Sequence, residues 1–162
     1  MRNILVPIDF SAVTPAVLDL ARTLAKSLGG EIHLVHVKEL TPAMPSSAIG
    51  FGVTGMPELM PTSSIPMVEA IAQPIAPNEQ DKAKLADWQK EIGQQGIQVK
   101  LHEPTGDIAE EILRIAGAVK ADLIVMGRHG HGAMYKLLVG SVTEGVLKRS
   151  DRPVLLVPAT RT

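Results

Sequence analysis

The chain has 162 residues, of which 45% are hydrophobic and 20% charged, a composition typical of one soluble globular domain spanning residues 1–162. Lys and Arg number 16 against 17 Asp and Glu, so no overall field attracts nucleic acid or anionic lipid, and any anion site must be local. Cysteine is absent, which excludes disulfides and thiolate chemistry. No apolar run approaches the ~20 residues that span a bilayer, so we expect a cytoplasmic protein with no membrane association.

The first part of the chain has the pattern of strand, helix and strand. Residues 3–8 are a short apolar run, as in a strand buried on both faces. Thr14, which is followed by proline, predicts an N-cap and a helix start, and the glycine pair at Gly29 predicts the helix end. Residues 32–37 predict the second strand.

The second part of the chain repeats this alternation. Apolar residues at helical spacing predict a helix over 79–95, and Asp107 with Glu110 predicts the start of the next one. A further helix is predicted over residues 141–149. The remaining predicted strands are residues 97–101, 122–126 and 153–157.

This alternation determines the fold class that we expect. Strands that alternate with helices form a parallel sheet with helices on both faces, and right-handed crossovers make it doubly wound. We therefore expect a five-stranded α/β fold. In such sheets ligands bind beyond the carboxyl ends of the strands, where the winding reverses. A site built from the ends of strands one and four requires those strands to be neighbours, which predicts the order 3-2-1-4-5.

Residues 41–77 interrupt the alternation with a segment rich in proline, glycine and methionine. A connection this long inside a compact domain is usually functional or disordered. One interpretation is a surface insertion without a specific role. The other is a lid or a methionine-rich surface for a protein partner, because methionine packs adaptably.

A glycine-rich segment follows the strand predicted at residues 122–126. Gly127 and Gly130 are separated by two residues, and nine more precede Gly140, which is followed by Ser141 at the start of a helix. Glycines allow a backbone to approach a ligand closely, and a helix N-terminus attracts phosphate. The pattern is neither a P-loop nor the dinucleotide fingerprint, which belongs after the first strand.

Side chains around this segment strengthen the phosphate interpretation. Ser141 and Thr143 supply hydroxyl donors, and Arg128 supplies a charge-assisted donor. A ligand-free alternative stays open, because Ser141 with Glu144 also matches a capping box.

The spacing of these glycines resembles the nucleotide-binding signature of the universal stress protein family. The lines Asp122-Leu-Ile-Val-Met-Gly and Pro153-Val-Leu-Leu-Val-Pro are similar to the C-terminal half of that family, and Asn3-Ile-Leu-Val-Pro-Ile-Asp-Phe-Ser resembles its first strand and loop. The resemblance covers the chain except the proline-rich insertion. It implies a doubly wound five-stranded fold that binds ATP, with Mg²⁺, and a homodimer paired through the last strand.

The resemblance also implies roles for individual residues. Asp9 would face the ribose or adenine, the backbone of Val37 would meet the adenine edge, and the glycine-rich segment would hold ribose and phosphates. Pro7 and Ile8 would line the base pocket. The full set of expected site residues is Pro7, Ile8, Asp9, Val37, Met126, Gly127, Arg128, Gly130, Gly140, Ser141, Val142 and Thr143.

Other polar residues have simpler interpretations. Asp9 also fits a cap or Asx-turn before the first helix. His129 and His131 alternate, but no matching third metal ligand is evident, so no metal site is predicted. The carboxylates from Asp107 to Glu111 fit helix capping better than acid–base catalysis.

Three functions follow from this pattern. The first is a nucleotide-responsive stress-response module that binds ATP, because the sequence offers a phosphate cradle without a recognisable catalytic base. The second is a slow ATPase or adenylate hydrolase. The third is an adaptor whose insertion at 41–77 binds a protein partner while the nucleotide site is vestigial. The exposed apolar run at residues 154–157 also favours pairing with a second copy.

Overall fold

A computed structural model of the chain describes residues 2–41, 73–74, 79–128 and 140–158. Its helices are α1 (Thr14–Leu28), α2 (Glu79–Gln94), α3 (Ile108–Ala118) and α4 (Ser141–Arg149). Its strands are β1 (Asn3–Pro7), β2 (Glu31–Val35), β3 (Leu40–Thr41), β4 (Gln73–Pro74), β5 (Val99–His102), β6 (Leu123–Gly127) and β7 (Val154–Val157).

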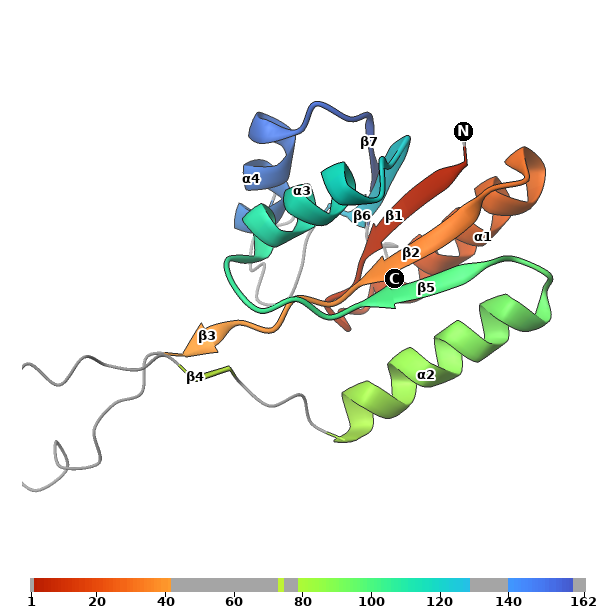
Figure 1. Ribbon diagram of the computed structural model, residues 1–162, viewed down its shortest axis with the longest axis horizontal. Coiled ribbons are helices and arrows are strands. Elements are labelled where there is room, and N and C mark those ends of the chain that lie inside the picture. The colour runs from red at the N-terminus through yellow and green to blue at the C-terminus, as the bar shows by residue number, and fades with distance from the viewer. Residues whose placement is uncertain (1, 42–72, 75–78, 129–139, 159–162) are drawn as a thin grey trace, which may run out of the picture.

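The main sheet has five parallel strands in the order β5-β2-β1-β6-β7 (Figure 1). Numbered along the chain, these strands give the order 3-2-1-4-5, so the predicted fold class and strand order are confirmed. The chain winds outward from β1 through β2 to β5, returns to β6 on the other side of β1, and ends at β7. The winding therefore reverses between β1 and β6.

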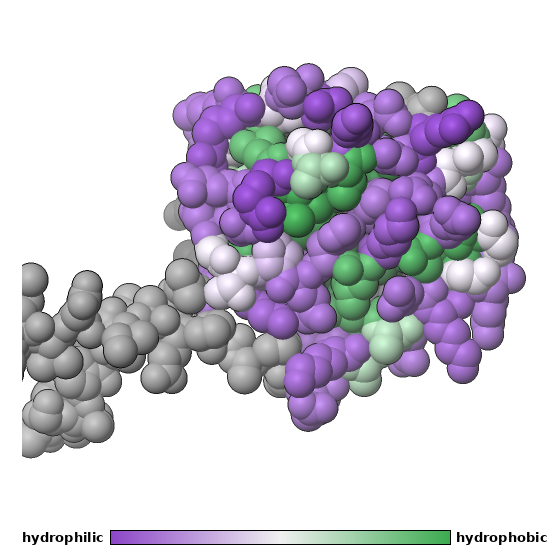
Figure 2. Space-filling model, in the orientation of Figure 1, coloured by the Kyte–Doolittle hydropathy of each residue, from purple (hydrophilic) through white to green (hydrophobic). Residues whose placement is uncertain are grey.

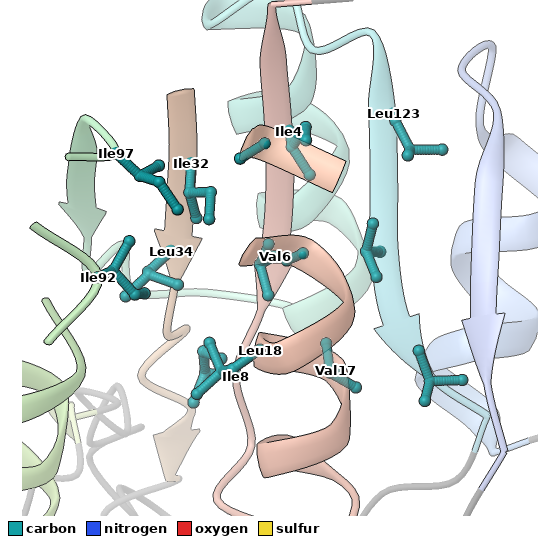
Figure 3. Packing of buried hydrophobic residues seen from close by; sticks show 14 of the residues in the cluster. Ile4, Val6, Ile8, Val17, Leu18, Ile32, Leu34, Ile92, Ile97 and Leu123 are labelled. Atoms are coloured by element: carbon teal, nitrogen blue, oxygen red, sulfur yellow. The ribbon is translucent and has the colours of Figure 1, made fainter. Parts of the chain in front are cut away.

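Helices cover the sheet in two layers, each with its own core. Ile4 and Val6 of β1 pack with apolar residues of α1 and α2, whereas Leu5 packs with residues of α3 and α4. Figure 3 shows the first of these clusters, where Val17 and Leu18 of α1 lie against the strands. Alternate side chains of a strand point to opposite faces, so an apolar run supplies both cores.

The first helix begins differently from the sequence expectation. Thr14 is predicted as the N-cap, and this is wrong, because Thr14 is the first helical residue and Val13 holds the N-cap position. The hydroxyl of Thr14 donates to Oδ1 of Asp9 at 3.1 Å, which draws it into the turn that precedes the helix. The predicted end is confirmed, since Gly29 is the C-cap with the left-handed φ of 62° that glycine adopts without strain.

The two ends of the proline-rich segment lie side by side. Leu40 pairs with Pro74 and Thr41 with Gln73 in a short antiparallel ladder, β3 with β4. The chain thus leaves the body after β2 and returns beside the same point before α2 begins at Glu79 (Figure 1). Residues 42–72 and 75–78, which include most of the insertion predicted at residues 41–77, lie outside the described residues.

The surface of the body is mostly hydrophilic on the face shown in Figure 2, with apolar residues showing between the polar ones. Among the described helices, none combines the length and apolar character needed to cross a bilayer.

A series of polar side chains, linked by hydrogen bonds, crosses β2 and β5 on one face of the sheet. Lys100 Nζ lies 3.1 Å from Oε1 of Glu31, which accepts a hydrogen bond of 2.8 Å from His33 Nε2. His33 Nδ1 and His102 Nε2 are 3.0 Å apart. Burial lowers the pKa of His102 below its ordinary value, and the nearby charges of His33 and Lys100 lower it further.

This arrangement predicts that acid weakens the fold through His102. Because the pKa of His102 is lower in the folded than in the unfolded chain, the unfolded chain binds the proton more readily. The stability that neutral His102 contributes is fully present above its unfolded pKa of 6.5, and it is lost as pH falls through its lower folded pKa. We expect His102→Gln, which can still donate to His33, to reduce the loss of stability between pH 7.5 and 5 in urea unfolding. An unchanged pH dependence in that variant would contradict the assignment.

Candidate functional site

The carboxyl ends of β1, β2 and β6 meet at one edge of the sheet, because these strands are parallel neighbours. The reversal of winding between β1 and β6 falls at this edge, which is where doubly wound sheets bind ligands. The chain that follows each of these strands carries expected site residues.

The two ends of the connection between β6 and α4 are tied together. The Thr143 hydroxyl, on a side chain that is only 2% exposed, donates to the carbonyl of Gly127 at 3.2 Å. The Gly140 N–H donates to the carbonyl of Arg128 at 3.2 Å, and the Arg128 N–H donates to Val157 of β7 at 2.9 Å. These bonds place the N-terminus of α4 beside the carboxyl end of β6.

Among the described residues, no side chain caps the N-terminus of α4. Gly140 holds the N-cap position with φ of −63° and ψ of 152°, and Ser141 is an exposed residue of the first turn. Glu144 instead pairs with Lys148 at 2.6 Å. The capping-box alternative for Ser141 and Glu144 is therefore wrong. Within the described part of the chain, no cap side chain neutralises the partial positive charge of this helix start, and that charge favours an anion.

A groove of about 560 Å³ runs beside this helix start, between α3 and α4. Its lining residues are Glu39, Gly106, Asp107, Ile108, Ala109, Ser141, Val142, Gly145 and Arg149. Gly145 allows the two helices to approach, since a Cβ there would lie 3.1 Å from that of Ala109. Arg149 pairs with Glu110 of α3 at 3.3 Å.

The carboxylates at the start of α3 are used within the protein. Asp107 caps α3 by accepting from the N–H of Glu110 at 2.9 Å, as the sequence predicts. Glu110 pairs with Arg149, and Glu111 pairs with Arg114 at 2.6 Å. The capping interpretation is confirmed for Asp107, whereas Glu110 and Glu111 form ion pairs.

Asp9 is an exposed residue just beyond β1, and its carboxylate organises the following turn. Its Oδ1 accepts from the N–H of Ser11 at 3.0 Å and from the hydroxyl of Thr14 at 3.1 Å. The Asx-turn alternative is thus confirmed. Because Asp9 remains exposed at the sheet edge, this role is compatible with a contact to a ligand.

The other expected residues of β6 and of the segments after β1 and β2 are largely buried. Ile8 is 5% exposed, its N–H donates to Val35 at 2.8 Å, and its carbonyl lies 3.2 Å from Nδ1 of His36. Val37 and Met126 are 8% and 4% exposed and belong to the core under α3 and α4. Such residues contribute shape and backbone position rather than exposed side-chain chemistry.

Several expected residues are not described. Gly130 and the pair His129 and His131 lie outside the described residues, so their place relative to the helix start is not part of the structure. Pro7, by contrast, ends β1 and is half-buried at the sheet edge.

The sequence interpretation missed the residues that line the groove and those that set the contact between α3 and α4. Gly106 and Glu39 line the groove, and Gly106, at the end of the loop before Asp107, is a signal that was available in the sequence. Gly145 and Arg149 set the contact of α4 with α3, and only the packing of two helices distant in sequence reveals them.

A second groove, of about 600 Å³, lies at the opposite edge of the sheet. Its lining includes Arg2, Lys26, Glu31 and Gln98, which lie near the amino ends of strands and the C-terminal ends of α1 and α2. Helix C-termini carry partial negative charge, so this edge is the less favourable one for phosphate.

Comparison with known proteins places this geometry in a family. The sequence model of the universal stress protein family matches residues 1–158. The universal stress protein MJ0577 of Methanocaldococcus jannaschii is 31% identical over 159 residues, which cover 96% of this chain and 94% of that protein. A solved structure of MJ0577 matches with a TM-score of 0.70 and 28% identity, covering 99% of this chain and 98% of that chain.

Two further solved structures share the fold and contain adenine nucleotides. One is the universal stress protein from Archaeoglobus fulgidus in complex with dAMP, with a TM-score of 0.61 and 19% identity, covering 96% of this chain and 97% of that chain. The other is a universal stress protein in complex with cAMP, with a TM-score of 0.62 and 19% identity, covering 98% of each chain.

Proposed function

This chain belongs to the universal stress protein family, and we propose that it binds ATP, with Mg²⁺, at the carboxyl edge of its sheet. The observation that carries the proposal is the start of α4, beside the point of winding reversal, where glycine holds the N-cap position and no described side chain caps the helix charge. The adenine nucleotides in two solved neighbours support the choice of adenine.

The proposed site divides into a phosphate half and an adenosine half. The phosphate half consists of Gly127, Arg128, Gly130, Gly140, Ser141, Val142 and Thr143. The adenosine half consists of Pro7, Ile8, Asp9, Val37 and Met126. Since the Thr143 hydroxyl donates to Gly127, we assign the contact of Thr143 with phosphate to its backbone N–H. The exposed hydroxyl of Ser141 is a donor at the helix start.

Mg²⁺ would complete the phosphate half by neutralising charge on the triphosphate. Asp9 is the exposed carboxylate of the proposed site, and a carboxylate near phosphates is tolerated when a cation lies between them. We propose that Asp9 contacts either the ribose hydroxyls or, through water, the cation.

Calorimetric titration of the protein with ATP, AMP and adenosine, each with Mg²⁺, tests the proposal. Because the helix start binds phosphate, we expect ATP to bind about 100-fold or more tightly than adenosine, roughly 2.7 kcal/mol. Equal affinities would contradict a phosphate site. Release of inorganic phosphate over many turnovers in the same samples would favour the slow ATPase, whereas intact ATP would favour the nucleotide-responsive module.

We also propose a homodimer through β7. This strand is an edge of the sheet, and Leu155 on it and Leu147 on α4 are 36% and 42% exposed. An unpaired apolar edge favours pairing with a second copy.

Leu155→Arg is expected to shift the protein from dimer to monomer at micromolar concentration in light scattering, because it places a charge in the proposed interface. Leu28→Arg is the matched control, since Leu28 is 46% exposed at the end of α1, and it should remain dimeric. A wild-type monomer at that concentration would contradict the dimer.

A protein partner at residues 41–77 is the remaining proposal, together with a cytoplasmic location. Because β3 pairs with β4, the ends of this segment lie together, which suits a module that extends from the body. If the segment serves a partner, a chain with residues 42–72 replaced by a short glycine linker keeps its ATP affinity. A large loss of ATP affinity would assign the segment to the nucleotide site instead.

A further inference from the structure

The turn after β1 contains a residue in an unfavourable backbone conformation. Phe10 has φ of 57°, in the left-handed region that non-glycine residues avoid. Ser11, the next residue, has a buried hydroxyl oxygen with no hydrogen-bond partner among the described residues. Both features fall between Asp9 and Thr14, where the Asp9 carboxylate holds the turn. Such local costs persist where surrounding structure imposes them, and they concentrate at functional sites.

The Phe10 side chain explains why this turn does not simply use glycine. Its ring lies 4.8 Å from the His36 ring, centroid to centroid, in an edge-to-face arrangement, and 5.7 Å from the Trp88 ring in a stacked one. Lys84 Nζ is 5.8 Å from the Phe10 centroid. Glycine would adopt the same φ without strain but would make none of these contacts, so the ring is what the position requires.

The ring also links two parts of the molecule that are distant in sequence. His36, which follows β2, places Nδ1 3.2 Å from the carbonyl of Ile8, so the residues on both sides of Asp9, Ile8 and Phe10, contact the His36 ring. Trp88 and Lys84 belong to α2, the helix that follows the proline-rich segment. Phe10 packs against the core under α1 and α2, on the face opposite to that of Val37 and Met126.

We infer that Phe10 is a positioning residue for the nucleotide site: its ring, fixed against His36 and Trp88, holds the turn that presents Asp9, and it transmits nucleotide binding to α2. The inference rests on the proposed function, since Asp9 is the group that would contact the nucleotide. It assigns to α2 a response to ligand that neither the glycine pattern nor the sheet edge implies. Trp88 is the single tryptophan of the chain, so its fluorescence reports this contact directly.

The test compares ATP affinity and Trp88 emission in the wild type and in two Phe10 variants. In the wild type, saturating Mg²⁺-ATP should change Trp88 emission with the same midpoint as the calorimetric titration. Phe10→Gly, which keeps the backbone conformation and removes the ring, should bind ATP about ten-fold more weakly and lose the emission change. Phe10→Tyr, which keeps the ring, should retain both within about two-fold.

A double variant shows whether Phe10 acts through Asp9. Asp9→Asn weakens ATP binding if the carboxylate contacts the nucleotide or its cation. Because Phe10 acts through that residue, Asp9→Asn with Phe10→Gly should bind no more weakly than Asp9→Asn alone. Losses that add fully would overturn the inference, since they would mean that Phe10 acts independently of Asp9.

A merely structural role gives a different result. Loss of packing lowers the urea midpoint but leaves the affinity of the folded fraction unchanged, so affinity is measured at a temperature where circular dichroism shows each variant folded. If Phe10→Gly does not fold, the wild-type emission decides, and an emission unchanged by saturating ATP overturns the inference. If the wild type binds no ATP, the proposed function itself fails.

Discussion

Replacing Ser141 with aspartate is expected to weaken ATP binding by about 100-fold or more while leaving the fold at least as stable. Ser141 is exposed in the first turn of α4, so the new carboxylate needs no repacking. A negative charge at a helix N-terminus stabilises the helix by about 0.3–1 kcal/mol. The same charge occupies the position proposed for phosphate and repels it, so stability and affinity should change in opposite directions.

Ser141→Asn is the matched control, because asparagine has nearly the same shape as aspartate but carries no charge. It should bind ATP within about ten-fold of the wild type, since it still offers a hydrogen-bond donor. Calorimetry gives the affinities and urea unfolding gives the stabilities. Equal ATP binding by Ser141→Asp and the wild type would show that the start of α4 is not the phosphate site.

The second large effect concerns the core under the site. Ile124 is fully buried in β6, pairs in register with Leu5 of β1 and Val154 of β7, and belongs to the cluster under α3 and α4. Ile124→Ala should lower the free energy of unfolding by about 2–5 kcal/mol, because it removes buried apolar surface and leaves a cavity. That is a large share of the roughly 5–15 kcal/mol that stabilises a typical domain.

Two further variants calibrate this result in the same urea experiment. Ile124→Val should cost about 0.5–1.5 kcal/mol, since it removes one methylene group. Leu28→Ala, at the exposed end of α1 and outside the proposed dimer interface, should change stability by no more than about 0.5 kcal/mol. An Ile124→Ala cost as small as that of Leu28→Ala would mean that β6 is not a central strand.

The fold was predictable because its determinants are periodic and local. Short apolar runs such as residues 3–8 and 122–126 can be buried only in a sheet covered on both faces, and the helices between them impose parallel strands. The strand order 3-2-1-4-5 came from requiring Asp9 and the glycine-rich segment to share an edge, and the sheet confirms that order.

The details that the sequence did not predict depend on contacts between distant residues. Thr14 fits an N-cap by residue type, yet its hydroxyl bonds to Asp9 and the helix begins at Thr14 itself. The pairing of β3 with β4 involves two residues on each side, too short for any periodic pattern. Neither follows from local propensity.

The position of the candidate site in the fold could be predicted from the sequence, but the residues that hold its parts in place could not. Gly140 and Ser141 indicate a helix start after a strand, so the glycine spacing identified the carboxyl edge of the sheet as the candidate site. The role of Phe10 could not be predicted from the sequence, because glycine or asparagine, and not phenylalanine, indicates a left-handed backbone conformation. Only its contacts with His36 and Trp88 reveal why the ring is there.

The most direct test of the nucleotide site follows backbone amide resonances of ¹⁵N-labelled protein during a titration with Mg²⁺-ATP. The amides of Asp9, Gly127, Val142 and Thr143 should shift together and saturate at one affinity, because they lie at the carboxyl edge where the winding reverses. Shifts that cluster instead around Arg2, Lys26 and Gln98, at the groove of about 600 Å³ on the opposite edge, would contradict the proposed site.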